Sequence, residues 1–209
     1  MQENLVPVLE QAGVVPVIVV DNVSDALPLA QALVEGGLNV LEVTLRTEAA
    51  LAAVEEIAKH LPDAHVGTGT VLNAGDIQRS VDAGATFMVS PGATEALLDA
   101  ADNVSVPLLP GAANPSEVMR LFERGYGYQK FFPAEAAGGI PMLKSIGGPL
   151  AKVKFCPTGG VSPSNARDYL ALSNVVCVGG SWMAAPKLVA EKNWAEITRL
   201  AKEASLLKG

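Results

Sequence analysis

The sequence predicts an α/β protein whose parallel strands close into a (β/α)8 TIM barrel, preceded by a short N-terminal helix. Short runs rich in valine, leucine and isoleucine alternate with alanine-rich stretches along the whole chain, as βα units on a parallel sheet do. The strand runs are almost continuously apolar, which fits a sheet that is buried on both faces. No linker or low-complexity segment interrupts the series, so we expect a single domain over residues 1–209.

Strand candidates recur at intervals of about 20–25 residues, and a series of eight βα units indicates a barrel. The main alternative is an open doubly wound sheet, which usually has a glycine-rich first turn. The first turn here, Val20-Asp21-Asn22-Val23, has no glycine. The candidates are Val14–Val20, Val40–Arg46, His65–Val71, Phe87–Ser90, Val106–Pro110, Tyr128–Phe132, Val153–Pro157 and Val175–Gly179.

Residues that cap helices precede several of the alanine-rich stretches. The segment Asn114-Pro115-Ser116-Glu117 offers an N-cap, a proline at the first helical position and an acidic residue in the first turn. Ser162-Pro163 repeats the pattern of cap and proline, and Asn73 and Thr94 are further caps. A short helix over roughly Glu3–Ala12 precedes the first strand.

The charge and hydropathy of the chain exclude several kinds of partner. The net charge is −7 and the basic residues are scattered, which argues against binding to nucleic acid or to an anionic membrane. No apolar run reaches the roughly 18 residues that span a bilayer. The first residues, 1–4, carry no basic signal region, so we expect a cytoplasmic protein.

Cysteine and histidine usage argues against a disulfide or a metal site. Cys156 and Cys177 lie inside apolar runs, which indicates buried, reduced thiols. The two histidines, His60 and His65, form no cluster with metal-ligand spacing. We therefore expect neither a metal nor another cofactor.

Lys130 is the first candidate for chemistry because it lies in the aromatic run Tyr128–Phe132. A lysine on a buried strand loses its hydration, so its pKa should fall and some neutral amine should exist near neutral pH. A neutral amine attacks carbonyl groups and forms Schiff bases. The alternative is a structural lysine whose ammonium reaches solvent or pairs with a carboxylate.

Polar residues also interrupt the second and third strand candidates. Side chains alternate along a strand, so Glu42, Thr44 and Arg46 share one face. The opposite face is apolar and should meet helices, which leaves the polar face pointing into the barrel. Thr68 and Thr70 are expected to repeat this arrangement. The alternative is a buried ion pair between Glu42 and Arg46 that has only a structural role.

Two glycine-rich turns follow the last two strand candidates. They read Thr158-Gly159-Gly160 and Gly179-Gly180-Ser181. Glycine lets the backbone approach a ligand and point N–H groups at it, and the corresponding loops of TIM barrels often bind phosphate. We expect a phosphate site there, with the hydroxyls of Thr158 and Ser181 as additional donors.

Several segments resemble the 2-keto-3-deoxy-6-phosphogluconate (KDPG) aldolase family, class I aldolases of the Entner–Doudoroff pathway. The segments span nearly the whole chain, and together they are highly specific. They are Val15–Ile18, Leu41–Thr47, Gly67–Leu72, Ser90–Gly92, Lys130–Glu135, Phe155–Gly160 and Gly179–Trp182.

The resemblance implies a role for each matching residue. Lys130 matches the Schiff-base lysine and Glu42 the general acid/base. Arg46 and Thr70 match groups that hold the pyruvyl end of the substrate. The remaining matches are the pocket walls Pro91 and Phe132 and the phosphate-binding residues Thr158, Gly159, Gly160, Gly180 and Ser181.

The implied reaction is the reversible cleavage of KDPG, a small phosphorylated keto acid, to pyruvate and glyceraldehyde 3-phosphate. The resemblance also implies a homotrimer. Related activities stay open, on 2-keto-4-hydroxyglutarate or on the galactonate epimer. A phosphosugar isomerase or epimerase on the same barrel, with Glu42 as an enolising base, is a further alternative, as is a phosphosugar-binding protein without catalysis.

Overall fold

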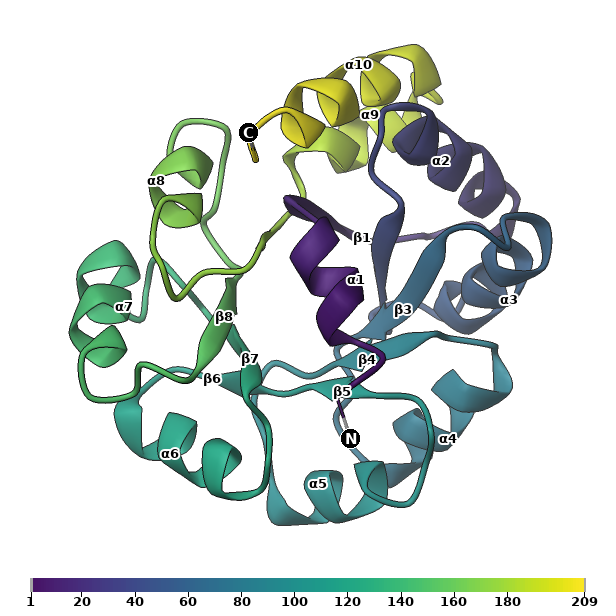
Figure 1. Cartoon of the computed structure of the whole chain (residues 1–209). Coiled ribbons are helices and arrows are strands. Elements are labelled where there is room, and N and C mark those ends of the chain that lie inside the picture. Colours follow the sequence, from purple (N-terminus) through teal and green to yellow (C-terminus); the bar gives the residue numbers. More distant parts are fainter. Residues whose placement is uncertain (1, 209) are drawn as a thin grey trace.

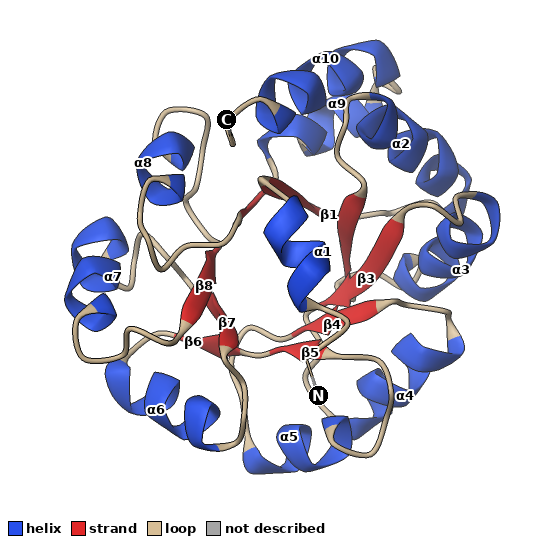
Figure 2. Ribbon diagram, in the orientation of Figure 1, coloured by secondary structure: helices blue, strands red, loops and turns tan. Residues whose placement is uncertain are grey.

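The computed structural model describes residues 2–208 and has the predicted α/β class, with a curled parallel sheet surrounded by helices (Figure 1). The strands form an inner ring, and the helices other than the N-terminal one lie around it (Figure 2). The strands are β1 Val14–Ile18, β2 Val40–Thr44, β3 His65–Gly69, β4 Phe87–Val89, β5 Leu108–Leu109, β6 Gly111–Ala112, β7 Tyr128–Phe131, β8 Lys154–Pro157 and β9 Val178–Gly180.

The strands form a six-stranded sheet in the order β5-β4-β3-β2-β1-β9 and a three-stranded sheet in the order β6-β7-β8. The fifth predicted strand, Val106–Pro110, is shortened to β5, and a separate strand β6 follows Pro110, which has no N–H to contribute to a ladder. Between β8 and β9, two isolated parallel bridges pair Phe155 with Val175 and Thr158 with Gly179. The ladders therefore do not run continuously around the ring.

The helices mostly follow the strands as predicted. They are α1 Val6–Gln11, α2 Val23–Glu35, α3 Ala50–His60, α4 Ala74–Asp82, α5 Glu95–Ala101, α6 Pro115–Glu123, α7 Gly139–Gly147, α8 Ala166–Leu170, α9 Pro186–Ala190 and α10 Trp194–Ser205, with a 3-10 turn, η1, at Trp182–Ala184.

Side chains confirm three of the predicted helix caps. Asn73, Thr94 and Asn114 each accept a hydrogen bond from the backbone N–H three residues later. The predicted start at Ser162-Pro163 is wrong, because α8 begins at Ala166. The Asn165 side chain instead accepts from the Ser162 N–H, at 2.8 Å, and folds the preceding segment into a turn.

The apolar side chains form two clusters, one on each face of the sheet, because successive side chains of a strand point to opposite faces. Leu41, Val43 and Met88 belong to the larger cluster, which lies between the sheet and the helices. Val40 and Phe87 belong to the smaller one, which fills the inside of the ring. Helix α1 lies across the ring (Figure 1) and packs on this inner cluster.

Candidate active site

Lys130 and Glu42 meet inside the ring. Lys130 lies on β7 and Glu42 on β2, and Nζ lies 3.2 Å from Glu42 Oε1. The two side chains are only 6% and 4% exposed. Nζ also lies 5.3 Å from the centre of the Phe132 ring, which attracts a cation. The structure therefore joins the two residues that the sequence singled out, although 88 positions separate them.

Gly69 at the end of β3 provides the space for the Glu42 carboxylate. A Cβ atom at this position would lie 2.2 Å from Glu42 Oε1 and 2.7 Å from its Cγ. Contacts that short do not occur, so the carboxylate can reach Lys130 only because β3 has no side chain here. The glycine thus allows the contact between Glu42 and Lys130 through the space it leaves.

Arg46 contacts Thr70 and not Glu42. Its Nε lies 3.4 Å from Thr70 Oγ1, and among residues 2–208 no carboxylate pairs with its guanidinium. The alternative of a self-satisfied pair between Glu42 and Arg46 is therefore wrong. A guanidinium that no protein carboxylate neutralises is suited to bind the carboxylate of a substrate.

The prediction that Thr68 and Thr70 point together into the ring is also wrong. Thr68 points outward and donates to Ser80 of α4 at 2.8 Å. Thr70 has a φ of 61°, a left-handed conformation that is rare for a residue with a branched side chain. This conformation ends the alternation after Gly69 and brings the Thr70 hydroxyl to Arg46. Strained backbone of this kind is frequent at functional sites.

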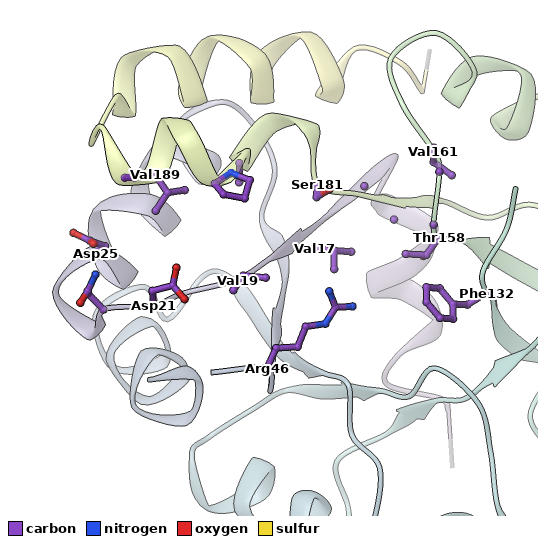
Figure 3. A pocket seen from close by; sticks show the side chains of 18 residues that line it. Val17, Val19, Asp21, Asp25, Arg46, Phe132, Thr158, Val161, Ser181 and Val189 are labelled. Carbon is purple, nitrogen blue, oxygen red and sulfur yellow. The ribbon is translucent and has the colours of Figure 1, made fainter. Parts of the chain in front are cut away.

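A cavity of about 560 Å³ opens at the ends of these strands. Figure 3 shows the Arg46 guanidinium pointing into it, with Phe132 and Thr158 facing it from the opposite wall. Seven of the predicted site residues line the cavity, namely Arg46, Phe132, Thr158, Gly159, Gly160, Gly180 and Ser181.

The other four predicted site residues lie outside the cavity lining. Lys130 is connected to the cavity through the Phe132 ring, and Glu42 lies against Lys130. Thr70 reaches the cavity through Arg46. Pro91 packs its carbonyl against Gly111, the strand neighbour of Lys130. Of the other three, only Glu42 contacts the Lys130 ammonium directly.

One wall of the cavity is formed by residues that were not predicted from the sequence. Asp21, Asn22 and Asp25 line it from the segment that follows β1, and Pro186 and Val189 line it from α9. Figure 3 shows Asp21, Asp25 and Val189 together on the side away from Thr158. The position of Asp21 and Asn22 just after a strand was the available signal, because loops at strand ends form the sites of such folds.

Both glycines of the turn after β8 need to be glycine. Gly159 has a φ of 98° and Gly160 a φ of 82°, a region that residues with a side chain rarely adopt. The ring of Phe132 packs on Gly159. The Thr158 side chain packs on Gly179, and the Trp182 ring packs on Gly180. Close packing of backbone against side chains gives this end of the cavity a fixed shape.

The two cysteines are buried and free, as predicted. Cys156 is the strand neighbour of Lys130. A hydrogen bond with Cys177 lowers the pKa of the Cys156 thiol despite its burial, and the positive charge of Lys130 adds to this. Both thiols belong to the inner apolar cluster.

A lysine that adds to a ketone needs a proton acceptor within hydrogen-bond reach, and Lys130 has one. An amine beside a base inside a βα ring therefore fits the class of enzymes that form Schiff bases with carbonyl substrates.

Comparison with known proteins identifies the family. The family model of KDPG and KHG aldolase matches residues 5–200. A 2-dehydro-3-deoxy-phosphogluconate aldolase from Pseudoalteromonas atlantica is 52% identical over 197 residues, which cover 94% of this chain and 92% of the relative. The chain belongs to the KDPG and KHG aldolase family, and it is an aldolase, a lyase.

Solved structures of the family agree with the arrangement of this chain. KDPG aldolase from Legionella pneumophila, with pyruvate captured at low pH as a covalent carbinolamine intermediate, is 49% identical with a TM-score of 0.93 and covers 94% of this chain and 96% of its own. The aldolase of Zymomonas mobilis ZM4 with 3-phosphoglycerate is 48% identical, also with a TM-score of 0.93, and covers 100% of this chain and 97% of its own.

Proposed function

We propose that this chain cleaves 2-keto-3-deoxy-6-phosphogluconate reversibly to pyruvate and glyceraldehyde 3-phosphate through a Schiff base on Lys130. The contact of 3.2 Å between Lys130 Nζ and the Glu42 carboxylate carries the proposal. The covalent carbinolamine captured with pyruvate in the Legionella relative supports it. Both groups are buried, so their chemistry is shielded from bulk water.

The first half of the reaction forms the Schiff base. Glu42 takes a proton from the Lys130 ammonium, and the neutral amine attacks the C2 ketone. Glu42 then moves protons between nitrogen and oxygen until water leaves, which gives an iminium and returns the carboxylate. A carboxylate within hydrogen-bond distance of the nitrogen is placed for these transfers.

The second half breaks the C3–C4 bond. Glu42 accepts the proton of the C4 hydroxyl, and the bonding electrons move into the iminium, which becomes an enamine. Glyceraldehyde 3-phosphate leaves. The enamine takes a proton at C3 from the protonated Glu42, which becomes a carboxylate again, and hydrolysis of the resulting iminium releases pyruvate and restores Lys130.

The two ends of the substrate are held by different groups. The Arg46 guanidinium and the Thr70 hydroxyl bind the carboxylate of the pyruvyl end, with Pro91 and Phe132 as walls. The phosphate lies against Thr158, Gly159, Gly160, Gly180 and Ser181 at the far end of the cavity. The relative that binds 3-phosphoglycerate supports a site for a phosphorylated three-carbon product.

The test is reduction with borohydride in the presence of pyruvate, followed by peptide mapping. We expect one covalent adduct, on Lys130, and none in Lys130→Ala. An adduct on another lysine would refute the assignment. The same experiment separates an aldolase from an isomerase or epimerase. An isomerase or epimerase on this barrel would use no covalent lysine and would give no adduct.

Activity on 2-keto-4-hydroxyglutarate is a second candidate, because the matching family includes KHG aldolases. Its second carboxylate would occupy the phosphate site. Comparing turnover of both keto acids by the same preparation tests this.

For the whole molecule we propose one domain with a closed (β/α)8 barrel, a homotrimeric state and a cytoplasmic location. The isolated bridges between β8 and β9 support closure. The exposed apolar side chains Met119 and Phe122, on one face of α6, support contacts between copies. No helix within residues 2–208 is long and apolar enough to cross a membrane. Scattering at several protein concentrations tests the oligomeric state.

A further inference from the structure

Each backbone carbonyl of the turn after β8, from Thr158 to Gly160, accepts a hydrogen bond. Ala134 N–H donates to Thr158 O at 2.8 Å, and Glu135 N–H donates to Gly159 O at 3.0 Å. The Asn165 side-chain amide donates to Gly160 O at 3.1 Å. Each of the three successive carbonyls therefore has its own donor outside the cavity.

These bonds determine where the following N–H groups point. In a trans peptide the N–H points opposite to the carbonyl of the same unit, so anchoring Gly159 O and Gly160 O directs the N–H groups of Gly160 and Val161 the other way. Within residues 2–208 neither of these two N–H groups donates to a protein acceptor. Both residues line the cavity, and successive free N–H groups attract anions.

The segment that supplies two of the three donors is itself held by α8. The Tyr169 hydroxyl donates to Glu135 Oε1, and the Tyr169 side chain is fully buried. Burial, and then the hydrogen bond to Glu135, raises the pKa of the Tyr169 phenol, so it stays a donor at neutral pH. The Glu135 side chain also covers Gly160, where a Cβ would lie 2.5 Å from Glu135 Cγ.

We propose that Tyr169, Glu135 and Asn165 are positioning residues that hold the Thr158–Val161 turn with its N–H groups facing the cavity, and so determine the affinity for the phosphate of the substrate. None of their side chains needs to touch the substrate. The inference rests on the proposed function only for the identity of the phosphorylated ligand. It separates recognition of the phosphate from the chemistry at Lys130.

Tyr169→Phe tests this with the loss of a single hydroxyl, and Asn165→Ala removes the third anchor. Tyr128→Phe is the matched control, because the Tyr128 hydroxyl makes a similar bond to Glu10 at 2.8 Å, at the opposite end of β7. We expect KM for the phosphorylated keto acid to rise roughly 5- to 30-fold in both test variants, the factor of one modest interaction. The control should keep the KM of the parent chain.

Two further measurements separate positioning from general damage. The dissociation constant of inorganic phosphate, from a phosphorus NMR titration, should rise in parallel with KM. The pyruvate concentration that gives half-maximal borohydride trapping should not change, because pyruvate carries no phosphate. An unchanged phosphate constant in both variants, or an equal loss of pyruvate trapping, would overturn the inference. If the parent chain traps no pyruvate, the proposed function is wrong. The phosphate titration would still test the positioning role of Tyr169, Glu135 and Asn165.

Discussion

Replacing Gly69 by alanine should separate Glu42 from Lys130 without changing either residue. The new Cβ would lie 2.2 Å from Glu42 Oε1, so the carboxylate must retreat by about 1 Å to reach an ordinary contact distance. Its present separation from Nζ is 3.2 Å, and the retreat would take it beyond hydrogen-bond range. A displacement of about 1 Å at a reacting group can cost ~10²-fold in rate. We therefore expect kcat to fall by about that factor.

Pyruvate formation coupled to lactate dehydrogenase measures this rate. The backbone of Gly69 is not left-handed, so alanine adds crowding and no dihedral strain. Gly127→Ala is the control, because a Cβ there would meet no atom within 4 Å. Thermal unfolding of both variants shows whether the fold survives. A folded Gly69→Ala variant with nearly full turnover would refute the reasoning that the Glu42 position limits the reaction.

Three other outcomes are expected. Glu42→Gln should slow turnover by about 10²–10⁴-fold, the usual effect of a lost general acid/base, while some pyruvate trapping on the lysine remains; full activity would remove Glu42 from the mechanism. Arg46→Lys should weaken pyruvate binding, because lysine cannot bind a carboxylate in bidentate fashion; an unchanged pyruvate titration would contradict that role. Burial, and then the bond to Glu10, raises the pKa of Tyr128 to about 12. The unfolded phenol titrates near 10, so this part of the stability is present below about pH 10 and is lost as the pH rises toward 12. Urea unfolding over this range should show a smaller alkaline loss for Tyr128→Phe, and equal losses would contradict the shift.

Much of the fold could be predicted because buried parallel strands have a local signature. Apolar runs of strand length, separated by stretches with helix caps, placed β1 to β4, β7 and β8 within a few residues of their observed bounds. The division of the fifth strand at Pro110 was harder to foresee. The missing N–H of Pro110 interrupts the sheet only if a neighbouring strand would bond to it. Which residues pair there depends on how the neighbouring strands are arranged.

The candidate site was predicted residue by residue, yet its contacts were not. Alternation correctly placed Glu42 on a polar face, but it could not say which cation would meet it. Lys130, from across the ring, is the partner, and the neighbouring Arg46 is not. Alternation also failed between Thr68 and Thr70, because the left-handed backbone at Thr70 ends it.

The amino-acid sequence by itself determined the strand and helix pattern and the family, and it singled out Lys130 as the candidate nucleophile, since these depend on local composition and on motifs. Only the tertiary structure decided which groups touch. The space over Gly69 that admits Glu42, the contact of Arg46 with Thr70, and the carbonyls of Thr158 and Gly159 held by the segment after β7 each join parts of the chain that are distant in sequence. Their distances depend on how the sheet curls, and no local pattern encodes that geometry.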